Sequence, residues 1–251
     1  MNEKDLEFKV EFAKVKIEVK AVYPYLKKFC KDYIIEDSDT EWVPDFKIEM
    51  TPAELQKEKE KDKDTAVSGS SAPYLETLAF LRKLCDKLAE YQCFLMHGAV
   101  ISWKENAYMF TAPSGTGKST HIALWRKYLG EGVQVINGDK PFLRIEGNQV
   151  RVYGSPWAGK EGWQNNTSGV LNGICVLKQA KKNKIQRLSA VEALPYLVPQ
   201  IHFTEEAEQA GKLLDSLDQL LLQVPIYCLE CDRSKEAVAC SFETLSGEKM
   251  R

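Results

Sequence analysis

The sequence predicts a mixed α/β protein with a largely antiparallel sheet, on three observations. Residues 94–103 and 107–110 have the apolar character of two strands, and the turn Lys104-Glu105-Asn106 between them indicates a hairpin. A glycine-rich stretch, residues 111–120, directly follows the second strand, and the helix-like run 121–125 follows that stretch. A glycine-rich loop that joins a strand to a helix usually belongs to a parallel sheet. Here its strand is the second arm of a hairpin, so antiparallel pairing is expected around it.

The N-terminal third is predicted from alternation and capping signals. Alternation over residues 6–20 slips by one position near Phe12-Ala13, which indicates a bulge or a turn between two strands. Thr51 and Glu54 form a capping box with Pro52 in the first turn of a helix. A further helix over 74–90 is expected to bury one face made of Tyr74, Leu78, Leu81, Cys85 and Leu88.

The same patterns place the remaining elements. Ser189 and Glu192 form a second capping box, which begins a helix at residue 190. The other expected elements are strands at 45–50, 133–136, 142–145, 150–153, 170–177, 185–188 and 226–229, and helices at 22–34, 190–197 and 205–222.

The domain boundary is expected near residue 70. The run 56–64 is almost entirely Lys, Glu and Asp, and Ser68-Gly69-Ser70-Ser71 follows it, as in a solvated helix end and a flexible loop. Residues 1–70 are therefore interpreted as a small N-terminal α+β region, and residues 71–251 as the main domain.

Composition limits the classes of partner. The 251 residues include 34 basic and 36 acidic ones, so the net charge gives no reason to expect nucleic acid or an anionic membrane surface as a partner. The polar start of the chain argues against a signal peptide, and a cytoplasmic protein is expected. The seven cysteines are expected to be reduced. Cys228 and Cys231 have the spacing of a metal knuckle, but a zinc site needs four ligands, so structural roles are favoured.

The glycine-rich stretch carries the chemistry. It reads Thr-Ala-Pro-Ser-Gly-Thr-Gly-Lys-Ser-Thr, the phosphate-binding loop (P-loop, Walker A) pattern with Ala112 in place of the first glycine. Gly115 and Gly117 allow the backbone to curl and direct N–H groups at phosphate oxygens. Lys118 is expected to reach the β- and γ-phosphates of ATP, and the Ser119 hydroxyl to bind Mg²⁺. An ordinary glycine-rich turn is the alternative.

Four motifs follow one another along the chain: His97-Gly98, the hairpin, the loop 114–119 and Gly138-Asp139. In this order they resemble the catalytic domain of HPr kinase/phosphorylase, which is related in fold to phosphoenolpyruvate carboxykinase. The resemblance covers roughly residues 74–230. It implies that Asp139 exchanges a proton with a substrate hydroxyl and that His97 lies beside the phosphates. The family usually has two adjacent aspartates, whereas this chain has Gly138 before Asp139. Its later glutamate-containing signature is also not recognisable here.

Several roles stay open at this stage. Asp139 is expected to be the base, but it can also be a structural carboxylate. His97 can equally be a half-buried strand histidine. Lys160 is a candidate to stabilise charge on the transferred group and Glu161 to complete the metal shell, although both can be solvated surface charges. The candidate sets are catalytic Asp139, Lys118, His97 and Lys160; nucleotide-binding Pro113, Ser114, Gly115, Thr116, Gly117, Lys118, Ser119 and Thr120; and metal-binding Ser119, Asp139 and Glu161.

The function expected from these residues is an ATP- and Mg²⁺-dependent kinase with a hydroxyl acceptor. The acceptor is expected to be a seryl or threonyl group of a peptide or small protein, or else a free amino acid or small alcohol. The alternative is an ATP-binding regulatory module without phosphotransfer. Carboxykinase chemistry is disfavoured, because the chain is about half the size that such enzymes imply by resemblance. The region 1–70 is interpreted as a lid, a docking element or a dimer contact, so homo-oligomer formation stays open.

Overall fold

The computed structural model describes residues 6–36, 42–63, 69–204 and 206–250. The chain forms two compact units, Met1–Tyr91 and Gln92–Arg251. The sequence put a boundary near residue 70, but the helix that follows it packs within the N-terminal unit. The charged run expected to end in a flexible loop extends into residues 64–68, which lie outside the described residues.

The N-terminal unit contains a three-stranded sheet in the order β1-β2-β3. Strands β1 (Glu7–Phe12) and β2 (Val15–Lys20) form an antiparallel hairpin, and β3 (Phe46–Glu49) pairs parallel to β2. Ala13 and Lys14, with φ of 51° and 61°, form the two-residue turn. The slip in alternation was therefore a turn, one of the two expected alternatives.

Of the helices of this unit, the one that follows Thr51 begins where its capping signals predicted. The helices are α1 (Pro24–Phe29), α2 (Pro52–Lys63) and α3 (Ala72–Leu88), with 3-10 turns at Lys31–Tyr33 and Ala89–Tyr91. At the start of α2, Thr51 N donates to Glu54 Oε2 (2.8 Å) and Glu54 N donates to Thr51 Oγ1 (3.4 Å). This confirms the capping box.

The buried face of α3 differs in part from the expected one. Leu81, Cys85 and Leu88 are buried as predicted, but Tyr74 is 43% exposed. The fully buried Glu76 lies on the inner face, where its carboxylate accepts hydrogen bonds from Val22 N (2.5 Å) and Tyr23 N (3.0 Å) at the start of α1. A search for apolar periodicity does not find an acidic residue that is buried because it accepts hydrogen bonds from backbone N–H groups.

The C-terminal unit contains one nine-stranded mixed sheet. The path runs β4-β8-β9-β10-β6-β5-β7, and β12 pairs with both β10 and β11. Only the β6–β10 and β10–β12 pairs of this sheet are parallel among the described residues. The largely antiparallel sheet is as predicted. Its strands are β4 (Cys93–Leu95), β5 (Ala99–Trp103), β6 (Asn106–Thr111), β7 (Val133–Asn137), β8 (Phe142–Glu146), β9 (Gln149–Tyr153), β10 (Ser168–Gln179), β11 (Lys184–Leu188) and β12 (Ile226–Cys231).

One expected strand is wrong. Residues 94–103 form two strands, because β4 pairs with β8 at one end of the sheet path, whereas β5 pairs with β6 and β7 at the other. The connection Met96-His97-Gly98 must therefore cross the sheet path, and it leaves regular pairing to do so. The predicted β5–β6 hairpin is confirmed.

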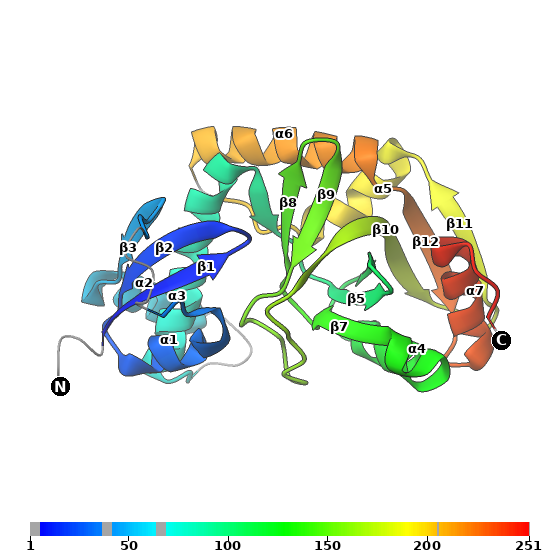
Figure 1. Cartoon of the computed structure of the whole chain (residues 1–251), viewed down its shortest axis with the longest axis horizontal. Helices are drawn as coiled ribbons and strands as arrows, with labels where there is room; N and C mark the ends of the chain where they lie inside the picture. The colour runs from blue at the N-terminus through cyan, green and yellow to red at the C-terminus, as the bar shows by residue number, and fades with distance from the viewer. Residues whose placement is uncertain (1–5, 37–41, 64–68, 205, 251) are drawn as a thin grey trace. The chain divides into compact units, whose positions relative to one another are not determined.

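Helices cover both faces of this sheet (Figure 1). One face packs on α5 (Ala190–Leu197) and α6 (Ala207–Gln223), and the other packs on α4 (Lys118–Leu129) and α7 (Lys235–Ser246). Strand β6 shows the alternation: Met109 faces the α5/α6 side and Phe110 the α4/α7 side. The sequence analysis did not predict α7, although Ser234 caps its start and Gly247 ends it.

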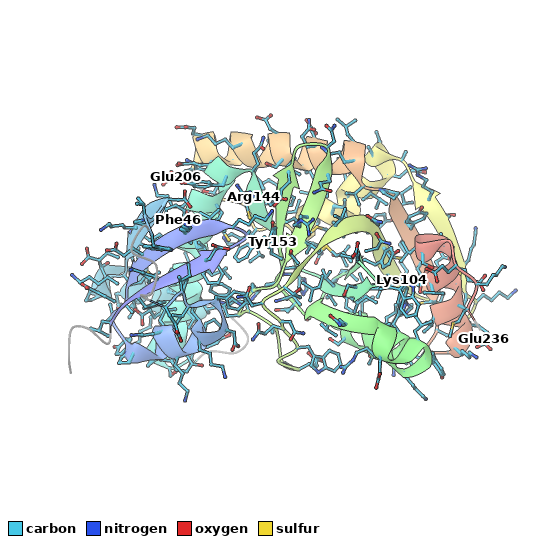
Figure 2. The ribbon with its side chains drawn as sticks, viewed as in Figure 1. Phe46, Lys104, Arg144, Tyr153, Glu206 and Glu236 are labelled. Carbon is cyan, nitrogen blue, oxygen red and sulfur yellow. The ribbon has the colours of Figure 1, made fainter. Side chains whose placement is uncertain are left out.

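Polar side chains also reinforce the β8–β9 hairpin. The hydroxyl of Tyr153 on β9 donates to Glu146 on β8, and Arg151 pairs with the same carboxylate at 3.5 Å. Figure 2 labels Tyr153 and Arg144 on these two strands.

Among the described residues, none of the helices has the length and apolar character needed to span a bilayer.

A buried histidine links α4 to α7. His121 is 3% exposed, and its Nε2 lies 3.0 Å from Ser241 Oγ and 3.2 Å from Trp125 Nε1. Burial lowers the pKa of His121 from 6.5 to about 4. Since the unfolded chain binds the proton more tightly, this histidine makes the protein less stable as the pH falls from about 6.5 toward 4.

We predict that replacing His121 by Gln reduces this acid sensitivity. Between pH 7 and pH 4.5 the wild type should lose about 2 kcal/mol more unfolding free energy than His121→Gln, from the change in proton affinity. Urea titrations of both proteins at the two pH values measure the difference. Equal losses would show that His121 titrates normally in the folded state.

Candidate functional site

The glycine-rich loop, which has the P-loop sequence pattern, occupies the connection between β6 and α4. Gly115 and Gly117 have φ of 80° and 117°, in the left-handed region. A Cβ at either position would meet no atom within 4 Å. The requirement for glycine is therefore conformational, as the sequence predicted for a curled loop. Gly117 is the N-cap of α4, so the helix begins at Lys118 and directs its positive dipole end toward the curl.

Hydrogen bonds hold the loop closed. The Thr116 hydroxyl donates to Pro113 O (2.8 Å), and Lys118 Nζ donates to Ala112 O (2.8 Å) and Pro113 O (3.4 Å). Gln179, at the end of β10, donates through Nε2 to Thr116 O (3.0 Å). Strand β10, which pairs parallel with β6, thus also holds the loop in place through the backbone carbonyl of Thr116.

The side chain of Lys118 is largely buried. The residue is 7% exposed. Burial lowers the pKa of Lys118, and the negative charge of Asp139 acts in the opposite direction. Its only described hydrogen-bond partners are loop carbonyls, which a phosphate oxygen can replace as a charged acceptor.

Asp139 lies in the turn after β7. The buried Asn137 shapes this turn, because its Oδ1 accepts from Asp139 N and Lys140 N, both at 2.8 Å. Gly98 N donates to Asp139 O at 2.8 Å, which joins the turn to the segment that carries His97. The Asp139 carboxylate then lies 3.1 Å from His97 Nε2 and 3.9 Å from Lys140 Nζ.

The carboxylate of Asp139 is held in its ionised form. Burial raises its pKa, but the hydrogen bond from His97 and the positive charges of Lys140, His97 and Lys118 lower it by more. The net effect is a pKa below the ordinary value. Asp139 is therefore a negatively charged acceptor at neutral pH.

One cleft brings most of the candidate residues together. It has a volume of about 460 Å³, and the residues that line it are polar, charged or glycine. Pro113 and Thr116 do not line this cleft; they line a flanking cavity of about 550 Å³. The candidate residues that line the cleft are His97, Ser114, Gly115, Gly117, Lys118, Ser119, Thr120, Asp139, Lys160 and Glu161.

A second flanking cavity of about 370 Å³ lies beside the start of α4. Gly117 and Thr120 line both this cavity and the cleft, so the two spaces adjoin at the loop. Leu124 and Leu177 make part of its wall apolar, and Arg233 contributes a cation. The arrangement offers a polar space on one side of the loop and a partly apolar one on the other.

The loop after β9 supplies the far wall of the cleft. Lys160 and Glu161 are exposed on it, which fits either of the roles left open by the sequence. Gly159 has φ of 73°, and a Cβ there would lie 3.1 Å from Asp139 Cβ. The backbone of this loop therefore packs directly against the carboxylate-bearing residue.

The donor set of the cleft suits Mg²⁺. Ser119, Asp139 and Glu161 offer only oxygen ligands, and Mg²⁺ usually binds through one or two carboxylates together with phosphate oxygens. Among the described residues there is no group of three or more His, Cys, Asp or Glu side chains placed to hold a metal. Cys228 and Cys231 lie on opposite faces of the sheet, so this pair cannot chelate one ion. All seven cysteines are free.

Gly138 occupies the position where the resemblance would place a second aspartate. Its N–H donates to Trp163 O at 2.8 Å. A Cβ at this position would lie 3.1 Å from Ala158 O and 3.3 Å from Trp163 O. A side chain at position 138 would therefore need the loop after β9 to shift by a few tenths of an ångström, and the two carbonyl oxygens would repel a negative charge placed beside them.

Sequence reasoning missed two residues of this region. Asn137 was seen only as the end of a strand, although Asn before Gly-Asp is typical of a side chain that bonds backbone N–H groups two and three positions later. Gln200 contacts His97 through its side chain, at 2.9 Å. No local signal indicates Gln200, because the contact joins residues 103 positions apart.

The chain has a distant structural likeness to a known protein. No family model matches the chain, and no curated protein matches it. Among solved structures, the Hpr(Ser) kinase/phosphatase from Coxiella burnetii is similar with a TM-score of 0.35 and 12% sequence identity, over 61% of this chain and 93% of that one. At these values the likeness is distant.

We predict that restoring an aspartate at position 138 destabilises the fold. Gly138→Ala should cost about 1 kcal/mol for the close Cβ contacts, and Gly138→Asp about 2–3 kcal/mol, because it also buries a charge beside two carbonyl oxygens. Urea unfolding of both variants and the wild type measures these costs. A Gly138→Asp protein as stable as the wild type would show that the loop makes room for a second carboxylate.

Proposed function

We propose that this chain is an ATP- and Mg²⁺-dependent phosphotransferase that transfers the γ-phosphate to a hydroxyl group. The observation that supports this most is that one cleft is lined by both the curled P-loop and the ionised Asp139. The end of a triphosphate held by the loop would lie near the carboxylate of Asp139. Among the described residues, this is the only carboxylate with which His97 and Lys140 pair.

The nucleotide would lie across the loop. Loop amides from Gly115 to Ser119 and the N-terminus of α4 would bind the β- and γ-phosphates, with Lys118 exchanging its carbonyl partners for phosphate oxygens. The nucleoside would extend into the cavity beside Leu124 and Leu177, which adjoins the cleft at Gly117 and Thr120. Ser119, Asp139 and Glu161 are the candidate ligands of Mg²⁺, which when bound would neutralise charge on the phosphates.

The chemical step would use Asp139 as the base. The acceptor hydroxyl would give its proton to the carboxylate while its oxygen forms a bond to the γ-phosphorus. The bond from the γ-phosphorus to the bridging oxygen would break, and its electron pair would leave with ADP. Lys118 and Lys160 would stabilise the negative charge on the transferred group.

The acceptor would be a seryl or threonyl side chain of a peptide or small protein, or a free amino acid or small alcohol. Lys160 and Glu161 form an exposed wall of the cleft, which is compatible with either class. The N-terminal unit, which we propose to be a lid, a docking element or a dimer contact, would contribute to acceptor choice or to a homo-oligomer. A cytoplasmic location also stays a proposal.

A second function is an ATP-binding regulator without transfer. The observation that favours it is Gly138, which provides no second carboxylate and where a side chain would lie close to the carbonyl oxygens of Ala158 and Trp163. Incubating the protein with ATP, Mg²⁺ and panels of peptides, amino acids and small alcohols separates the two functions. A kinase gives acceptor-dependent ADP release and an acceptor mass increase of one phosphoryl group. Tight ATP binding without such turnover would support the regulator.

Two substitutions should separate binding from transfer. Asp139→Asn should lower turnover about 100-fold or more with ATP affinity little changed, because it removes the proton acceptor. Lys118→Ala should weaken ATP binding about 10- to 100-fold and lower turnover as well, because it removes a charged hydrogen bond. Calorimetric titration with MgATP and a steady-state ADP assay measure the two effects.

Matched controls are available on exposed surfaces. Asp218→Asn on α6 and Lys127→Ala on α4 make the same chemical changes outside the cleft, and both should behave as the wild type. Unchanged turnover in Asp139→Asn would remove this residue from the mechanism. Unchanged affinity in Lys118→Ala would show that the nucleotide does not bind at the loop.

A further inference from the structure

Gln200 makes two contacts with His97. Its backbone carbonyl accepts a hydrogen bond from His97 N at 2.7 Å, and its side-chain Oε1 lies 2.9 Å from His97 Nδ1. Gln200 ends the 3-10 turn Val198–Gln200 that follows α5, and it is 9% exposed. It does not line the cleft, so any effect it has on a bound molecule must act through His97.

The contact fixes the orientation of the imidazole ring. The Gln200 amide oxygen and the Asp139 carboxylate can only accept hydrogen bonds, so both ring nitrogens of His97 donate, Nδ1 to Gln200 and Nε2 to Asp139. Nε2, at the other end of the ring, then lies 3.1 Å from Asp139 Oδ1. The three side chains form a chain of contacts from the buried Gln200 to the wall of the cleft, with the ring held at both ends.

The backbone around Gln200 is positioned independently of its side chain. Met96 and Ile201 form an antiparallel bridge, and His202 N donates to Leu95 O at 3.1 Å. The bond from His97 N to Gln200 O continues this pairing. A change in the Gln200 side chain therefore leaves the local backbone pairing in place. Only the hydrogen bond between this side chain and the His97 ring is lost.

We propose that Gln200 is a positioning residue, which holds the His97 ring so that Nε2 faces Oδ1 of Asp139, and Oδ2, 3.9 Å from Lys140 Nζ, is the oxygen that accepts the proton of the acceptor hydroxyl. The catalytic consequence rests on the proposed function, whereas the hold on the ring does not. His97 lies in the irregular connection between β4 and β5, where strand pairing does not fix its side chain. Its backbone carbonyl is held separately, by the Thr111 hydroxyl at 2.8 Å.

The direct test is nitrogen-15 NMR of the histidine ring in the full-length protein. The chain has only three histidines, so a His97→Gln variant assigns the His97 signals. A hydrogen-bonded Nδ1–H resonance of His97 is expected in the wild type. This resonance should disappear in Gln200→Leu, which has no side-chain acceptor. It should remain in Gln200→Glu, because the glutamate carboxylate can accept the hydrogen bond at the same distance from the backbone. An unchanged His97 resonance in Gln200→Leu would overturn the proposal.

Kinetics provides the second readout. Gln200→Leu should lower kcat about 10- to 100-fold, as expected for a displaced reacting group, with the KM for ATP within about twofold of the wild type. Gln200→Glu should recover more of kcat than Gln200→Leu. Wild-type kcat in Gln200→Leu, with the ring signal lost, would show that ring position does not matter to the reaction. If the wild type binds ATP and transfers no phosphate, the proposed function fails, while the NMR result still decides whether Gln200 positions His97.

Discussion

The amide side chain of Asn137 is the contact on which the geometry of the cleft most depends. Its Oδ1 accepts from the backbone of Asp139 and Lys140, and its Nδ2 donates to Ser155 O (2.9 Å) and Ser155 Oγ (3.2 Å). One fully buried group thus ties the turn of Asp139 to the loop after β9. Each of these groups would cost about 1–3 kcal/mol if left buried without a partner, so the turn and the loop are stable only together.

The sheet explains why the carboxylate meets the P-loop. Strand β6 pairs antiparallel with β5, which pairs with β7, so the ends of β6 and β7 reach the same edge of the sheet. The loop leaves from the end of β6 and the Asp139 turn from the end of β7. His97 enters this edge because the connection from β4 must cross to β5. Because β6 and β7 run in the same direction on either side of β5, the loop and the Asp139 turn meet at one end of the sheet.

Much of the local structure could be predicted from the sequence, because its signals are short-range. The curl at Gly115 and Gly117, the capping boxes at Thr51 and Ser189, and the β5–β6 hairpin are each encoded within a few residues. The split of residues 94–103 into two strands was missed, since its cause is pairing with strands far along the chain. The missed helix α7 shows a different limit, because its buried Ser241 and Ala237 weaken the apolar pattern.

For the site, the sequence indicated the residue types but not their arrangement. Lys118, Ser119 and Asp139 belong to short motifs, and they line one cleft. The reason for glycine at position 138 became clear only from the carbonyl oxygens of Ala158 and Trp163, and the role of Gln200 only from its contact with His97. These contacts join distant parts of the chain, so no motif reports them.

The most direct measurement is a crystal structure of the protein with Mg²⁺ and a non-hydrolysable ATP analogue. We predict that the β- and γ-phosphates lie inside the curl at residues 114–119, with the γ-phosphate on the side of the cleft that holds Asp139. An ordered nucleotide bound elsewhere, or one whose terminal phosphate points away from Asp139, would contradict it.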